Sequence, residues 1–176
     1  KNQDFDYALK AENTQSNWDV SIERSADSLN DGDTAVAQFR LSGAAAQAEV
    51  GLRSASGKFF GVLIQPNNGK PEARLRYDAG AGLQTGAVLI DRDHFQLDRW
   101  YVIKLSLDQD DGFKVRLWRL DDPTSSGEGS LGGFAAETWR FRQRVNQGVL
   151  WLDDYFEGVL YRETETRYAA ITQYDT

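Results

Sequence analysis

Apolar and polar residues alternate along most of this chain, from about residue 35 to residue 156. In the segment 35–41, for example, Ala37, Phe39 and Leu41 share one side, whereas Gln38 and Arg40 share the other. An alternation with period two is typical of a β-strand that is buried on one face. It predicts strands at 35–41, 46–53, 58–65, 72–77, 100–107, 113–120, 138–145 and 149–156, with one or two more within 161–174.

Short segments rich in Gly, Asn and Asp separate the predicted strands, as at 30–32, 66–69 and 110–112. These residues tolerate the positive φ that tight turns require. The Gly- and Ser-rich segment 121–133 is predicted to be a long loop. No segment of about ten or more residues shows the apolar stripe of a helix. The chain 1–176 is therefore predicted to be a single all-β domain, in which two antiparallel sheets pack face to face as a sandwich.

The composition is typical of a folded domain and argues against some classes of binding partner. Hydrophobic residues make up 40% of the chain, with 5 Trp, 7 Tyr and 9 Phe, which is enough for a sizeable core. The net charge of −7 argues against nucleic acid or an anionic membrane as the main partner. No apolar run approaches the roughly 18 residues that span a bilayer, so no membrane span is predicted. Because the chain has no Cys, it offers no disulfide or thiolate metal site, and because it also has no Met, we expect a piece of a longer protein.

Several segments resemble domains of the concanavalin A-like (laminin G-like) family. They are Asp4-Phe5 followed by Trp18, the segment 100–105 followed by 112–118, and the closing segment 148–154. The resemblance implies a two-sheet antiparallel jelly-roll sandwich. Members of this family bind sugars, bind proteins or serve as spacers in large extracellular chains. The resemblance therefore implies a non-catalytic, lectin-like carbohydrate-binding module whose partner is a glycan or polysaccharide.

The end of the chain carries a second resemblance. The segment 168–175 is similar to the start of the tyrosine-aspartate repeats of large secreted bacterial shell proteins. That resemblance implies a domain attached to the remainder of a larger parent chain, secreted or on the cell surface of a bacterium. An ordinary terminal strand that ends in Tyr174-Asp175 explains the same residues.

Residues suited to catalysis are few. His94 is the single histidine, and it lies in a polar segment with Asp91 and Asp93, which is typical of a surface loop. Glycoside hydrolysis requires two carboxylates across one cleft. Glu163 and Glu165 are two residues apart, but neighbouring Arg side chains make ion pairing the simpler account. We therefore predict that the domain is not an enzyme, and a glycan-cleaving activity is the weakest of the hypotheses.

Calcium is the one cofactor that the sequence suggests. Alternation places Asp154 on the same side as Leu150 and Leu152, and a buried carboxylate needs a partner. That partner is a cation, an Arg or backbone amides. In sugar-binding modules similar to this chain, an Asp at this place helps to hold a structural calcium ion, so the resemblance implies a calcium site at Asp153 and Asp154.

A second acidic segment, 108–112, superficially resembles the start of an EF-hand loop. Arg119 stands where such a loop requires an acidic residue. A hairpin turn explains this segment better.

Sugar binding requires flat aromatic rings with polar side chains beside them. Trp118 and Trp151 fall on the side of their strands opposite the inward aliphatic residues. Arg116 precedes Trp118 by two positions, while Asp153 and Tyr155 follow Trp151 by two and four, so each set shares a face. These residues form the predicted ligand site. Other side chains that point off the core are Arg40, Glu49, Arg74, Arg76, Arg140 and Arg142.

A structural interpretation stays open for the same residues. Outward Arg and Glu side chains on neighbouring strands can pair as cross-strand ladders, and a Trp can cover the edge of the core. The alternative to a sugar-binding module is thus a structural or protein-interaction spacer. The exposure of the Trp residues discriminates between them, because a spacer buries or scatters its Trp side chains, whereas a binder clusters two of them on one concave face.

Overall fold

Every regular element in the described part of the chain is a β-strand. The computed structural model describes residues 9–15, 18, 20–23, 29–108, 110–134 and 137–158, and for residues 22 and 154–158 it describes the backbone. The strands are β1 (Leu9–Asn13), β2 (Val20–Glu23), β3 (Thr34–Ser42), β4 (Gln47–Ser54), β5 (Phe59–Asn67), β6 (Lys70–Asp78), β7 (Gln84–Ile90), β8 (Trp100–Ser106), β9 (Phe113–Arg119), β10 (Asp122–Leu131), β11 (Trp139–Asn146) and β12 (Gly148–Gly158). Within these residues no helix is long and apolar enough to cross a membrane.

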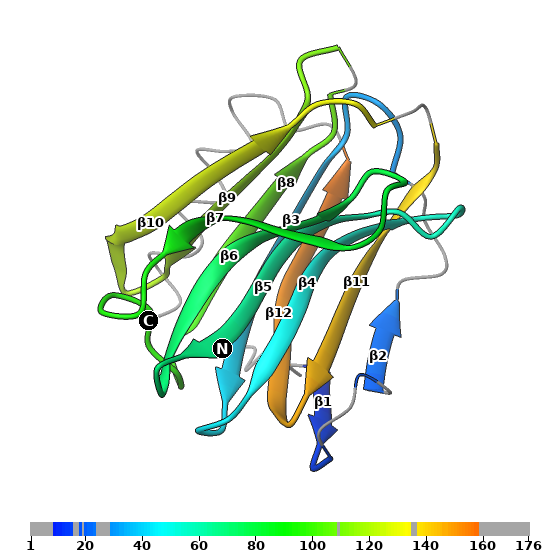
Figure 1. Cartoon of the computed structure of the whole chain (residues 1–176). Helices are drawn as coiled ribbons and strands as arrows, with labels where there is room; N and C mark the ends of the chain where they lie inside the picture. Colours follow the sequence, from blue (N-terminus) through cyan, green and yellow to red (C-terminus); the bar gives the residue numbers. More distant parts are fainter. Residues whose placement is uncertain are drawn as a thin grey trace, which may run out of the picture.

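The strands form two sheets of six, in which all neighbours run antiparallel. Sheet A has the order β1-β12-β3-β8-β9-β10, and sheet B has the order β2-β11-β4-β5-β6-β7. The two sheets are stacked, and sheet B lies in front of sheet A in Figure 1. The predicted two-sheet antiparallel sandwich is confirmed.

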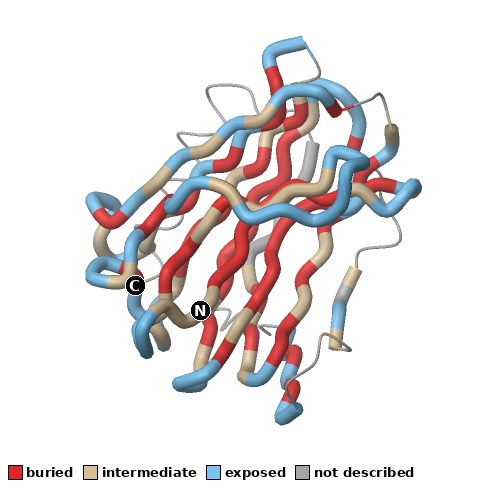
Figure 2. The backbone as a smooth tube through the Cα atoms, viewed as in Figure 1, coloured by how far each residue is buried: buried red, intermediate tan, exposed pale blue. Residues whose placement is uncertain are grey.

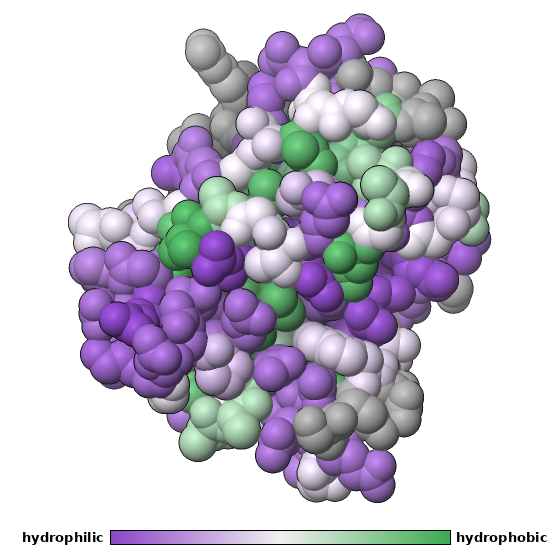
Figure 3. Space-filling view, in the orientation of Figure 1, coloured by the Kyte–Doolittle hydropathy of each residue, from purple (hydrophilic) through white to green (hydrophobic). Residues whose placement is uncertain are grey.

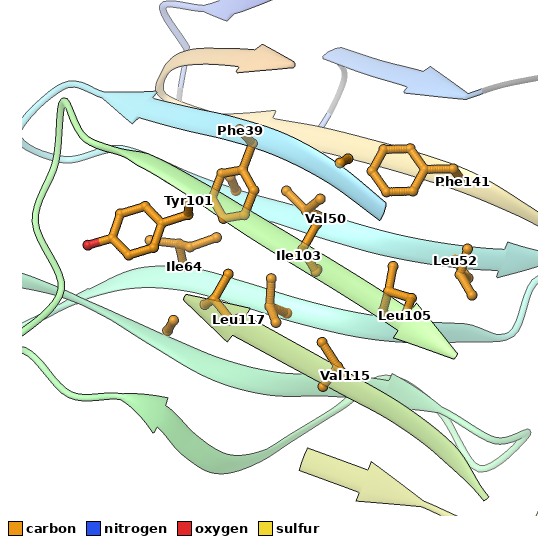
Figure 4. Close-up of a cluster of buried hydrophobic side chains, with 14 of the residues drawn as sticks. Phe39, Val50, Leu52, Ile64, Tyr101, Ile103, Leu105, Val115, Leu117 and Phe141 are labelled. Atoms are coloured by element: carbon orange, nitrogen blue, oxygen red, sulfur yellow. The ribbon is translucent and has the colours of Figure 1, made fainter. Parts of the chain in front are cut away.

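The core lies between the sheets and follows the predicted alternation. Buried positions alternate with more exposed ones along several of the strands, as Figure 2 shows. Phe39 stacks on Tyr101 with 5.9 Å between ring centroids, and Figure 4 shows both among the aliphatic side chains of the two sheets. A second aromatic group surrounds Trp139, which is fully buried and lies 5.0 Å from Phe113 and 5.4 Å from Phe134. Burial of so many large side chains is the main source of stability.

The prediction of a long loop at 121–133 is wrong. Residues Asp122–Leu131 form β10, which pairs with β9 at the edge of sheet A. Gly127 explains why so Gly-rich a segment becomes a strand, because a Cβ at this position would overlap the backbone carbonyl of Leu89 in β7. The missing side chain lets the edge strands of the two sheets approach closely, and this tertiary contact outweighs the low β-propensity of Gly and Ser.

Candidate functional site

The predicted ligand residues lie on the outer face of sheet A. Trp118 of β9 and Trp151 of β12 are both half-buried and point away from the core. Strands β3 and β8 lie between β12 and β9, so the two residues are not on neighbouring strands. At a strand spacing of roughly 4.8 Å, their backbones are about 14 Å apart across the sheet.

Trp151 belongs to a row of side chains that crosses four strands. The register aligns Lys10 with Trp151, Trp151 with Arg40, and Arg40 with Trp100. The Lys10 ammonium lies 5.5 Å from the centroid of Trp151, and the Arg40 guanidinium lies 5.3 Å from the centroids of both Trp151 and Trp100. These are cation–π contacts. The ring surfaces that face the cations are not available for a sugar.

The sequence interpretation left Trp100 out of the site. It opens its strand and alternates with the buried Tyr101, so the same reasoning that selected Trp118 and Trp151 applies to it. The structure therefore gives sheet A three outward Trp side chains.

A polar depression lies on the outer face of β8, β9 and β10, and Arg116, which lines it, also contacts the ring of Trp118. Its volume is about 460 Å³, and its polar lining consists of Lys104, Ser106, Lys114, Arg116, Glu128 and Ser130. A volume of this size is within the range of small-ligand sites. The hydroxyls, the carboxylate and the three cations supply both donors and acceptors, which is what the hydroxyl groups of a sugar require.

Charge interactions organise this depression. Arg116 lies 5.4 Å from the centroid of Trp118 and 3.3 Å from the carboxylate of Glu128. Burial, together with the nearby charge of Arg116, lowers the pKa of Lys104. The ammonium of Lys114 donates to Asp111 at 2.8 Å, which raises the pKa of Lys114 and lowers that of Asp111. Arg116 is exposed and paired only at the surface, so it is free to exchange Glu128 for a ligand.

The second group of predicted residues lies at an irregularity of β12. Asp153 is half-buried on the outer face and pairs with Gln38 of β3. The register shifts between Asp153 and Phe156, which pairs with Val36, so β12 contains one extra residue here. The bulge lies within the alternation from which the sequence placed Asp154 with Leu150 and Leu152, so that placement stays a prediction. The side chains of Asp154 and Tyr155 lie outside the described part of the chain.

The calcium prediction stays a prediction. No group of three or more acidic or His side chains with the arrangement of a metal site occurs among the side chains that the structure describes. The segment 108–112 forms a turn, as preferred from the sequence, in which Asp108 accepts from the backbone amides of Asp110 and Asp111.

His94 lies in an exposed turn, as predicted. Its Nδ1 is 2.8 Å from the carboxylate of Asp91, and its side chain is 69% exposed. The hydroxyl of Ser125 donates to the backbone carbonyl of His94 and not to the ring. A nucleophilic triad is thus not assembled around His94 by the residues described here. Glu163 and Glu165 lie outside them.

The outer face of sheet B carries a charged cluster that the sequence interpretation treated as cross-strand pairing. Glu49 of β4 points away from the core, yet it is fully buried beneath arginines of β6 and β11. Figure 3 looks onto this face and shows hydrophilic residues around a paler, partly apolar centre. The repeated Arg140-x-Arg142-x-Arg144 in one strand is the sequence signal from which this cluster could have been predicted.

The fold places the chain among antiparallel jelly-roll sandwiches. It is similar to the CBM2 module of the evolved Dit protein of Lactobacillus casei BL23 phage J-1, with a TM-score of 0.59 and 20% identity over 85% of this chain and 75% of that one. It is also similar to the carbohydrate-binding module CBM66 of Bacillus subtilis, with a TM-score of 0.55 and 16% identity over 86% and 91% of the two chains.

An enzyme shares the same architecture. The alginate lyase PA1167 of Pseudomonas aeruginosa has a TM-score of 0.54 and 11% identity over 74% of this chain and 68% of that one. At these identities the likeness defines the fold alone. No family model matches the sequence, and no curated protein matches it either.

Proposed function

We propose that this chain is a non-catalytic carbohydrate-binding module of a larger protein that a bacterium secretes or displays on its surface. The observation that carries the proposal is the polar depression of about 460 Å³, which Arg116 links to the half-buried ring of Trp118. The names of two similar structures, both carbohydrate-binding modules, support it.

Binding would combine stacking with hydrogen bonding. The indole of Trp118 offers a flat surface to the apolar face of a sugar ring once Arg116 turns toward the ligand. Ser106 and Ser130 both donate and accept, and Glu128 accepts from sugar hydroxyls. For a longer chain, Trp151 would extend the site along β12 if Lys10 and Arg40 turn away from its ring. The roles of Asp153 and Tyr155 stay predictions.

The same depression supports binding over hydrolysis. Its lining contains one carboxylate, Glu128, whereas glycoside hydrolysis requires two that face each other. This donor set supports a non-catalytic role.

A structural spacer is the second candidate function, and one observation favours it. The row Lys10, Trp151, Arg40 and Trp100 uses its aromatic rings for internal contacts. A spacer requires a rigid outer face of this kind and no ligand.

A glycan array of the isolated domain, followed by titration calorimetry with the ligand that it identifies, tests the proposal. Trp118→Ala removes a stacking surface worth roughly 1–3 kcal/mol by analogy with base stacking, so affinity should fall about 5- to 150-fold. Trp151→Ala should do the same for a long ligand. Arg99→Gln, which removes an exposed Arg that pairs with Asp121 and does not line the depression, is the control.

Far-UV circular dichroism of each variant should match that of the parent. A glycan whose affinity is unchanged by both Trp substitutions would show that the site is elsewhere. A domain that binds nothing on the array supports the spacer.

A further inference from the structure

The cluster on the outer face of sheet B has one acid and three bases. The Oε1 of Glu49 accepts from Nε of Arg76 at 3.1 Å, and its Oε2 accepts from Nε of Arg144 at 2.9 Å. A terminal nitrogen of Arg142 lies 3.6 Å from the same Oε2. Glu49, Arg76, Arg142 and Arg144 are hereafter the arginine cluster.

The charges of this cluster do not cancel. Three guanidiniums face one carboxylate, and the exposed fractions of the Arg76, Arg142 and Arg144 side chains are only 19%, 13% and 21%. Of the other acids described on this face, Glu72 pairs with Arg74, and Asp78 accepts from the backbone amides of Gly80 and Gly82. Glu23 pairs with Arg53 and Arg140 and also lies opposite Arg142 in the register of β2 and β11. Two carboxylates, those of Glu49 and Glu23, are thus shared among five guanidiniums. Charges that are largely removed from water are unfavourable without a counter-charge. An anion placed here would supply it.

Two glycines give the cluster its shape. Gly51 of β4 and Gly61 of β5 pair directly, and Arg142 and Arg76 flank them in the same row across β11, β4, β5 and β6. A Cβ on either glycine would overlap the backbone of the other strand. Because the row has no side chains at its centre, Arg76 can cross the sheet surface to reach Glu49, which lies two strands away.

Arg142 has hydrogen-bond donors that no described residue accepts from. It forms no hydrogen bond within the described residues, and its Nε is buried without a partner there. Its guanidinium lies 5.4 Å from the ring centroid of Phe59, which is almost fully buried. Burial and the neighbouring charge of Arg144 lower the pKa of Arg142 to about 10, so the group is cationic at neutral pH. A guanidinium matches a planar carboxylate through two parallel hydrogen bonds.

We propose that the arginine cluster is a second binding site, on the face opposite Trp118, that takes the carboxylate group of an acidic sugar chain such as a polyuronate. The carboxylate assignment rests on the cluster itself. That a sugar carries the carboxylate rests on the proposed function. The net charge of −7 repels polyanions in general, so recognition depends on this local excess of positive charge.

Polygalacturonate is the probe, and its fully methyl-esterified form is the matched ligand without charge. The parent domain should bind polygalacturonate at least about tenfold more tightly than the ester, because only the free carboxylate forms charged hydrogen bonds with the guanidiniums. The affinity should fall as salt is added. Equal binding of the two polymers, or no binding of polygalacturonate, would overturn the proposal without any variant being made.

Arg142→Gln tests the site. It should weaken polygalacturonate binding about 10- to 150-fold. It should leave the melting temperature unchanged or higher, because Arg76 and Arg144 still pair with Glu49 and one of the excess positive charges is removed. Arg99→Gln, an exposed position outside both sites, should change neither. A purely structural cluster predicts the reverse, a lower melting temperature with unaltered binding.

Three further outcomes separate this proposal from the proposed function. Loss of polygalacturonate binding in Trp118→Ala but not in Arg142→Gln would put the ligand on sheet A and overturn the second site. Tighter binding of dextran sulfate than of polygalacturonate would overturn the carboxylate assignment. Polyglutamate binding as tight as that of polygalacturonate would overturn the sugar part alone. A neutral glycan whose binding depends on Trp118 leaves the proposed function intact in every case.

Discussion

Arg40 lies between two indole rings, with its guanidinium carbon 5.3 Å from the centroid of Trp100 and 5.3 Å from that of Trp151. The three residues belong to β8, β3 and β12, so the contact joins neighbouring strands of sheet A by their side chains. The Nε of Arg40 is buried and has no hydrogen-bond partner in the described part of the chain.

A double-mutant cycle measures this contact. We expect Arg40→Met and Trp151→Leu to show a coupling of about 0.5–1 kcal/mol in the free energy of unfolding, the usual range for an exposed cation–π pair. The cycle is needed because Arg40→Met also removes a buried nitrogen that has no partner. That removal is favourable, so the single substitution underestimates the cost of losing the cation–π contact. Urea denaturation provides the free energies. A coupling of zero would mean that the ring and the cation are neighbours without attraction.

The glycine pair of sheet B makes a second prediction. Gly61→Ala should lower the free energy of unfolding by about 2–3 kcal/mol, because the added methyl group meets the backbone of β4 and not a movable side chain. Gly132→Ala is the matched control, since nothing lies within 4 Å of its Cβ, and it should stay within about 0.5 kcal/mol of the parent. Similar stabilities for the two variants in urea would contradict the close approach of β4 and β5.

Glu137 makes the stability of the domain depend on pH. Lys58 and Ser56 donate to its carboxylate, and these hydrogen bonds hold the pKa of Glu137 at about 2, below its ordinary 4.5. The stabilisation is complete above the ordinary pKa and is lost as the pH falls through about 2. Glu137→Gln should therefore lower the melting temperature at pH 7 and converge on the parent in strong acid.

Thermal melts of both proteins over this pH range test the prediction. Glu128→Gln, whose carboxylate is exposed on the opposite sheet, should follow the parent throughout. A constant difference between Glu137→Gln and the parent down to the lowest pH would refute the assignment.

Calcium at Asp153 and Asp154 stays a prediction with a direct measurement. A bound ion at a hundredfold excess over its Kd stabilises by about 2.7 kcal/mol, so calcium should raise the melting temperature and a chelator should reverse the change. Asp153→Asn and Asp154→Asn should both abolish the response, whereas Asp110→Asn in the hairpin turn should not. If both Asn variants melt like the parent, with and without chelator, neither an ion nor an ion pair is present.

Period-two patterning predicted the strands of the core because their inward positions carry large apolar residues. Trp139 and Phe141 alternate with Arg140 and Arg142, and the structure buries the first two residues as expected. The same rule failed for β10, because its inward position is Gly127 and not a large apolar residue. The strand forms there because a glycine lets the backbone approach the carbonyl of Leu89 in the other sheet. A contact between residues so far apart in sequence leaves no local pattern.

The candidate sites show the same limit. Alternation assigned Trp118 and Trp151 to an outward face, but the order of strands in the sheet decides that β3 and β8 separate them. The bulge after Asp153 also interrupts the backbone register of β12 in a way that the sequence does not signal. For the arginine cluster, the sequence indicated outward Arg and Glu residues, while their convergence on Glu49 depends on the paired glycines.

The contact of Gly127 with β7 also affects how the edges of the two sheets are exposed. Edge strands expose unpaired amide and carbonyl groups that can recruit a strand from another molecule. Here the outermost strands of both sheets, β7 and β10, lie against each other at one side of the sandwich, so each shields the open edge of its neighbour. A bulky residue at position 127 would push them apart and leave two templates for intermolecular pairing. The main effect of such a substitution would be self-association of the domain, so Gly127 helps to keep the domain soluble.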